Sequence, residues 1–172
     1  VRLDPQKNLE MLIDAFSRFE KLYPDYTLEI YGEGSQRSYL ENKCKEMNVE
    51  KKVVLKGFSK NLHENILDAS AFIMSSNYEG MSNSLLEALA LGVPVISTDH
   101  PIGGARMFIK NGNNGILTKV GDTDEMFNAL LFAANNPEKM QAMADEAIRI
   151  RQQISVEKIV SQWMSYIEKV CG

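Results

Sequence analysis

The sequence predicts an α/β domain: a Rossmann-like, doubly wound parallel sheet of about six strands with helices on both faces. Short apolar segments alternate along the chain with amphipathic segments of helical length. Several of the short segments are β-branched and apolar almost throughout, as strands covered on both faces are. Such alternation is typical of parallel strands joined by right-handed crossovers. Sheets of this kind bind ligands beyond the carboxyl ends of their strands, so the loops there are the first candidates for a site.

The expected elements follow one another with few residues between them. Strands are expected at 1–3, 27–31, 53–56, 71–75, 93–98 and 115–118. Helices are expected at 8–21, 35–47, 62–68, 84–91, 105–110, 123–135, 137–151 and 156–170. Gly92 and Pro94 end the helix that closes at 91, because glycine suits the position past a helix C-terminus and proline cannot continue the helix. Pro137 suits a first helical turn.

Length and composition exclude several function classes. The 172 residues are enough for one domain with a sizeable core, and 44% apolar with 24% charged residues is an ordinary globular balance. Acidic and basic residues are interspersed at a net charge of −4, so no nucleic-acid partner is expected. Cys44 and Cys171 are expected to be free thiols. No apolar run is long enough to span a bilayer. The opening VRLDPQKN carries no start methionine, and we expect the chain to be a piece of a longer protein.

The segment NYEGMSNSLLEALALGVPVI, 77–96, holds two glutamates, Glu79 and Glu87, around a predicted helix start. Unpaired backbone N–H groups and a partial positive charge at a helix start suit a phosphate. Carboxylates are poor phosphate ligands, but on either side of a diphosphate they are well placed to bind hydroxyls. The expected donors are the N–H groups of Gly80, Met81, Ser82, Asn83 and Ser84.

Both glutamates also have plain structural interpretations. Ser84 and Glu87 fit a capping box, in which the serine accepts from the backbone N–H of Glu87 and the glutamate reaches back towards Ser84. On that interpretation Glu87 serves the helix alone. Glu79 is equally explained as a solvated acid in a loop.

EGMSNSLLE resembles the E-x7-E motif of retaining glycosyltransferases with the GT-B fold, glycosyltransferase family 4. The resemblance covers essentially the whole chain and implies the C-terminal, donor-binding half of that fold. It implies that Glu79 holds sugar hydroxyls and that Glu87 fixes the ribose. The donor is then a UDP- or GDP-sugar, with no metal cofactor.

RLDPQKN, 2–8, resembles a second element of the same family, R-L-x-x-x-K-[GN], with Val1 where the family often has glycine. The resemblance implies that Arg2 and Lys7 stabilise the departing diphosphate. Two cations beside a phosphate are chemically suited to this. Lys7 alone is also explained as a solvated side chain at a helix start, although a cation is mildly unfavourable there without an anion.

Other strand-end loops complete the predicted donor site. IYGEGS places Gly32 and Gly34 after a strand, where the resemblance implies a close approach of backbone to the ligand. VVLKGFS places Lys56, Gly57 and Phe58 around the nucleobase by the same resemblance, although Phe58 is equally explained as a core aromatic. The two histidines lack a partner at metal-ligand spacing: His63 is expected to be solvated, and His100 follows a strand end within reach of a ligand.

The resemblance implies transfer of a sugar, with retention, to an acceptor sugar or lipid-linked sugar in surface polysaccharide or glycolipid synthesis. The acceptor domain would be a missing N-terminal half, so the isolated chain would bind nucleotide and transfer little. A cytoplasmic location is expected, peripheral at the inner face of a membrane through the missing domain. Two alternatives stay open: another GT-B enzyme, such as a sugar-nucleotide epimerase or a phosphorylase, and a non-catalytic nucleotide-binding module.

Overall fold

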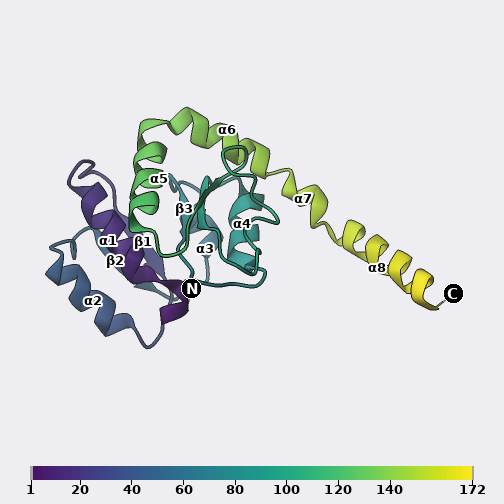
Figure 1. Ribbon diagram of the computed structural model, residues 1–172, viewed down its shortest axis with the longest axis horizontal. Helices are drawn as coiled ribbons and strands as arrows, with labels where there is room; N and C mark the ends of the chain where they lie inside the picture. The colour runs from purple at the N-terminus through teal and green to yellow at the C-terminus, as the bar shows by residue number, and fades with distance from the viewer. Residues whose placement is uncertain (1, 172) are drawn as a thin grey trace.

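The computed structural model describes residues 2–171 and confirms the α/β class, with helices around parallel strands (Figure 1). Every pairing between strands is parallel, with β1 beside β2, and β4 between β3 and β5. These two strand groups are not hydrogen-bonded to each other in the described chain. The strands are β1 (Leu28–Tyr31), β2 (Val53–Gly57), β3 (Phe72–Met74), β4 (Val95–Thr98) and β5 (Ile116–Thr118).

Five of the six expected strands are present, and the expectation of a strand at 1–3 is wrong. Among the described residues there, Arg2 forms an isolated bridge with Glu33. Val1 lies outside the described residues. The extended backbone stops early because the Asp4 side chain accepts from the N–H of Gln6, and Pro5 opens a short 3-10 helix. The first segment therefore turns at the end of the sheet.

The helices follow the predicted order, with two corrections. The helix expected at 105–110 is a series of turns, in which Met107 donates to the carbonyl of Gly103 and Ile109 to that of Ala105. The single helix expected at 137–151 is divided into α6 and α7. The observed elements are η1 (Pro5–Lys7), α1 (Leu9–Glu20), α2 (Arg37–Glu46), α3 (Leu62–Ile66), α4 (Asn83–Leu91), α5 (Thr123–Asn135), α6 (Pro137–Ala147), α7 (Ile150–Gln153) and α8 (Val156–Cys171).

Two groups of buried apolar side chains hold these elements. One joins α1 and α5 to the strands, and the other surrounds α4, β3 and β4. Leu85, Ala88 and Leu89 of α4 are almost wholly buried, so this helix is fixed against the sheet. Cys44 is buried and Cys171 exposed, both as free thiols, as predicted.

Helix α8 extends away from the rest of the chain (Figure 1) and has no buried residue. Its apolar side chains recur at helical spacing, and they are largely exposed. They are Val156, Ile159, Val160, Trp163, Met164, Tyr166, Ile167 and Val170. Within residues 2–171, no helix is both long and apolar enough to cross a membrane.

Candidate functional site

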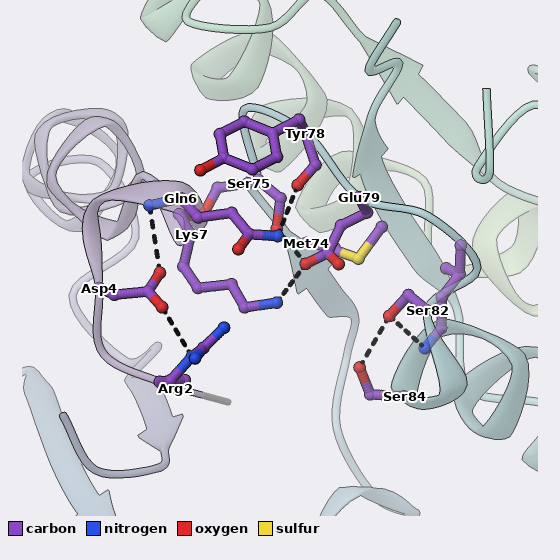
Figure 2. A network of polar contacts seen from close by, with 12 residues as sticks. Arg2, Asp4, Gln6, Lys7, Met74, Ser75, Tyr78, Glu79, Ser82 and Ser84 are labelled. Atoms are coloured by element: carbon purple, nitrogen blue, oxygen red, sulfur yellow. Dashed lines mark hydrogen bonds and ion pairs between the residues drawn. The ribbon is translucent and has the colours of Figure 1, made fainter. Parts of the chain in front are cut away.

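The segment from Arg2 to Asn8 lies against the loop that follows β3, and hydrogen bonds join the two (Figure 2). The N–H of Asn77 donates to the carbonyl of Gln6 over 2.8 Å, and the Ser75 hydroxyl donates to the carbonyl of Lys7 over 2.7 Å. Asn8 adopts a left-handed conformation, which asparagine tolerates, and its amide donates to the side chain of Asn77. Two sequence motifs some seventy residues apart are therefore built into one surface.

Lys7 and Glu79 form an ion pair at the centre of this surface (Figure 2). Their side chains are only 18% and 13% exposed. The Ser76 hydroxyl donates to the same Glu79 oxygen over 3.1 Å. Glu79 is therefore not the solvated loop acid that was one of its two interpretations.

Arg2 lies beside this pair in Figure 2, with its guanidinium 2.8 Å from the Asp4 carboxylate. The Arg2 side chain is 74% exposed. Gln6 donates from its amide to the carbonyl of Tyr78 over 2.8 Å. Each predicted cation thus has a carboxylate partner within the chain, and neither Asp4 nor Gln6 was singled out from the sequence.

Helix α4 begins one residue earlier than predicted, and its N-cap is Ser82 rather than Ser84. The Ser82 hydroxyl accepts from the N–H of Leu85 at 3.4 Å and lies 3.1 Å from the hydroxyl of Ser84. The capping box between Ser84 and Glu87 is therefore wrong, since Glu87 lies beyond the first turn. No acidic side chain occupies the first turn of α4, so the positive end of the helix is not offset from within its own first turn.

Glu87 instead approaches His63 at the start of α3, with 3.2 Å between its carboxylate and Nε2. Both side chains are partly exposed. The expectation that His63 is merely solvated is therefore corrected to a contact with Glu87. Glu87 therefore contacts His63, whereas Glu79 contacts Lys7, although both glutamates flank the start of α4.

Packing explains some of the glycines of the site but not all of them. A Cβ on Gly104 would lie 1.9 Å from the carbonyl oxygen of Gly80, so the loop after β4 packs directly on the loop after β3. A Cβ on Gly34 would meet the backbone of Leu3 at 2.3 Å. A Cβ on Gly80 meets nothing within 4 Å. Packing therefore requires glycine at 34 and 104 but not at 80.

The loops after β1 and β2 meet as well. Gly32 donates to the carbonyl of Gly57 over 2.8 Å, and both have positive φ. Phe58 is 77% exposed, so its interpretation as a core aromatic is wrong. Lys56 approaches Glu29 at 3.1 Å. Glu29 also accepts from the Tyr31 hydroxyl, and this bond raises the pKa of Tyr31 to about 12.

His100 is a feature whose surroundings the sequence did not predict. It is wholly buried, and neither ring nitrogen has a hydrogen-bond partner among the described residues. Burial lowers its pKa, Glu79 and Asp99 act in the opposite direction, and Lys7 adds to the lowering. The imidazole is therefore buried next to Gly104 with a lowered pKa, rather than reaching out to a ligand from the surface.

Arg106, in the turns after β4, binds the Asp99 carboxylate with two nitrogens. Within residues 2–171, no three His, Cys, Asp or Glu side chains lie close enough together to hold a metal ion. Arg2, Lys7 and Glu79 therefore lie near the start of α4 (Figure 2), whereas Glu87 and the loops after β1 and β2 make separate contacts. Such an arrangement can bind a phosphorylated ligand that also carries hydroxyls.

Comparisons with known proteins cover most of the chain. The family model "Glycosyl transferases group 1" matches residues 1–150. The chain is 33% identical over 166 residues to an N-acetylgalactosamine-N,N'-diacetylbacillosaminyl-diphospho-undecaprenol 4-alpha-N-acetylgalactosaminyltransferase of Campylobacter jejuni. The match covers 96% of this chain and 44% of that protein, so the chain spans about half the length of this relative.

Two solved structures share the fold. A mutant of TarM from Staphylococcus aureus, in complex with fondaparinux, alpha-GlcNAc-glycerol and UDP, superposes with a TM-score of 0.89 at 27% identity. That match covers 95% of this chain and 33% of TarM. HepE from Anabaena in complex with UDP gives a TM-score of 0.90 at 24% identity, over 98% of this chain and 47% of HepE.

Proposed function

Because the chain belongs to the glycosyl transferases group 1 family, we propose that it is the donor-binding domain of a retaining GT-B glycosyltransferase of family 4. The reaction moves a sugar from a nucleoside diphosphate to an acceptor, with the anomeric configuration kept. One observation carries the proposal: Lys7, Glu79 and the start of α4 meet at one end of the parallel strands. Ligands of such sheets bind at that end.

Arg2, Lys7 and the start of α4 stabilise the negative charge that develops on the departing diphosphate. An ammonium has three donors, of which Glu79 takes one, and the largely exposed guanidinium of Arg2 has five. The N–H groups from Gly80 to Ser84 add donors at the positive end of α4, whose first turn holds no acidic side chain. Preorganised donors of this kind are worth about 3 kcal/mol each. They do the work of a divalent cation, so the reaction proceeds without one.

The two glutamates bind hydroxyl groups on either side of the diphosphate. Glu79, held by Lys7 and Ser76, accepts from hydroxyls of the transferred sugar near the reacting carbon. Glu87 is 44% exposed and accepts from the ribose hydroxyls. In this account Glu79 positions the sugar and forms no covalent intermediate, with the acceptor attacking from the side of the leaving group.

The nucleobase lies at the loops that follow β1 and β2. Gly32 and Gly57 bring their backbones together there, and the exposed ring of Phe58 offers an apolar surface. Gly34 lets this loop pack on Leu3, and Lys56 lies at its edge. We propose uracil as the base, since the related TarM structure holds UDP.

The chain spans less than half of the Campylobacter relative, and we propose that the acceptor site belongs to a second domain outside this sequence. That relative's printed name describes sugar transfer to an undecaprenol-linked acceptor. We propose a lipid-linked or surface-polysaccharide acceptor for the whole enzyme, acting at the cytoplasmic face of a membrane. The isolated chain then binds nucleotide without appreciable turnover.

A titration panel tests the proposal. UDP, GDP, ADP and UDP-sugars are titrated into the chain by calorimetry with EDTA present, alongside Lys7→Met and Lys119→Met. Lys119 is the control, because like Lys7 it pairs with a carboxylate, but it is exposed and lies in the loop before α5. We expect UDP to bind without metal, the Lys7 variant to lose at least tenfold in affinity and the Lys119 variant to bind normally.

Other results of the panel contradict the proposal. If binding requires a divalent metal ion, then Arg2, Lys7 and the start of α4 do not suffice to stabilise the diphosphate. Equal affinity in the Lys7 and Lys119 variants places the diphosphate elsewhere. Binding of GDP or ADP in preference to UDP leaves the site intact and corrects the base.

A further inference from the structure

Helix α3 packs along α4 beside the predicted donor site. Leu62 and Ile66, one helical turn apart on α3, pack in the same apolar cluster as Leu85 and Leu89 of α4. This packing holds the two helices against each other. Polar side chains that border the apolar contact are therefore close in space, although the two helices are distant in the sequence.

His63 of α3 and Glu87 of α4 are such a pair. The imidazole Nε2 lies 3.2 Å from Oε2 of the carboxylate, and the two side chains are 59% and 44% exposed. A carboxylate has a second oxygen, so Glu87 can contact His63 and accept from a ligand hydroxyl at the same time. Exposed pairs contribute little to the stability of a fold. The contact therefore acts on the orientation of the Glu87 side chain rather than on stability.

The first turn of α3 is joined to the loop in which we place the nucleobase. Ser59 directly follows Phe58, and its hydroxyl accepts from the N–H of Asn61 over 3.2 Å and from the side-chain amide of Asn65 over 3.0 Å. The backbone N–H of Asn65 donates to the carbonyl of Asn61 over 3.2 Å. One short, hydrogen-bonded segment thus connects the exposed Phe58 ring to His63.

The order of the groups in a nucleotide matches this arrangement. A nucleobase is bonded directly to its ribose, so the side chains that bind them must be neighbours. Helix α3 leads from Phe58, at the proposed base, to a contact with Glu87, at the proposed ribose. Ordering a freely rotating glutamate costs side-chain entropy when a ligand binds. A second contact that already holds the carboxylate lowers that cost.

We propose that His63 is a positioning residue, whose Nε2 holds the Glu87 carboxylate in the orientation that accepts from the ribose hydroxyls. Hydrogen bonds in a ligand-free site are often long and tighten when the ligand is present. His63 then favours ribonucleotides over deoxyribonucleotides without touching the nucleotide. The inference rests on the proposed function, in which Glu87 binds the ribose, and it adds a residue that lies outside both family motifs.

Calorimetry with UDP and 2′,3′-dideoxy-UDP, in the presence of EDTA, tests the proposal, because the second ligand lacks both ribose hydroxyls. The proteins are the native chain, His63→Leu, His63→Gln and the control Glu64→Gln. Glutamine keeps an N–H donor, and Glu64 is an exposed neighbour on the same helix. We expect the native chain to prefer UDP by about tenfold, as for a hydrogen bond to a charged group.

The variants separate orientation of Glu87 from a structural role. His63→Leu should lower the preference for UDP about fivefold by weakening UDP binding alone, whereas His63→Gln should retain most of it and Glu64→Gln all of it. The urea midpoint of unfolding should be the same in all four proteins, because His63 is exposed. In a Glu87→Gln background, His63→Leu should have no further effect on the preference, since His63 acts through Glu87.

An unchanged preference for UDP in His63→Leu overturns the proposal. An equal loss of affinity for both ligands also overturns it, because that result indicates a structural role. A further loss in the Glu87→Gln background does so as well, because it indicates direct contact with the nucleotide. Equal affinity of the native chain for the two ligands contradicts the ribose role of Glu87 and this proposal with it, while the diphosphate site stands. Absence of UDP binding in the native chain contradicts the proposed function itself, and the inference falls with it.

Discussion

Removal of one partner from the ion pair between Lys7 and Glu79 tests the description of the site most sharply. Lys7→Met keeps the length and apolar stem of the side chain and leaves the Glu79 carboxylate 13% exposed, with the Ser76 hydroxyl as its remaining partner. Two charges at contact distance attract by about 4 kcal/mol at an effective dielectric constant near 20. The hydrogen bond from Ser76 retains about 1 kcal/mol of stabilisation for the carboxylate. We therefore expect Lys7→Met to destabilise the fold by about 2–3 kcal/mol, within the range for a broken, partly buried pair.

The assay is urea unfolding of four proteins at pH 7: the native chain, Lys7→Met, Glu79→Gln and the double variant. The double variant removes both charges, so it is expected to be more stable than the sum of the single effects predicts. We expect a coupling free energy of about 1.5–2 kcal/mol, because contacting charges are not additive. A coupling free energy below about 0.5 kcal/mol would refute the reasoning, since it would mean that solvent screens the pair as it does on an exposed surface.

Three further outcomes are expected from the same structure. Ser82→Ala should cost about 1 kcal/mol in urea unfolding, because it removes the N-cap of α4, and Ser84→Ala should cost less than half of that; equal costs would restore the cap at Ser84. Gly104→Ala should destabilise the fold by about 1–3 kcal/mol, since its Cβ meets the Gly80 carbonyl, whereas Gly80→Ala should stay within about 0.5 kcal/mol in the same assay. His100 has a lowered pKa in the folded state, so the unfolded chain takes up its proton first as pH falls below about 6.5, and stability is lost in that range. Unfolding measured from pH 7.5 to 5 should show this loss in the native chain and a smaller loss in His100→Asn; identical pH profiles would count against a buried neutral imidazole.

The sequence was sufficient for the fold class and for most elements, because periodicity and glycine or proline signals are local. It was insufficient at the start of α4, where three serine and asparagine residues in a row can each cap a helix. In the structure Ser82 is the N-cap, because the packing of Leu85 and Ala88 on the sheet places it at the helix start. Local sequence cannot supply that packing.

The predicted strand at 1–3 failed for a different reason. A strand requires pairing with a neighbouring strand over several residues. Here Arg2 forms an isolated bridge with Glu33 before Pro5 turns the chain. For the site, the family resemblance implied that Lys7 and Glu79 both serve it, but not that they bind each other. Contacts of that kind depend on tertiary structure and leave no signal in either motif.

The central claim is that a nucleoside diphosphate binds at the start of α4, and an NMR titration with UDP tests it most directly. Amide shifts are recorded as UDP is added to the chain in the presence of EDTA. The account predicts the largest shifts at the N–H groups from Gly80 to Ser84, with smaller ones near Gly57 and Phe58. Saturable shifts confined to other loops, such as 119–123 before α5, would contradict it.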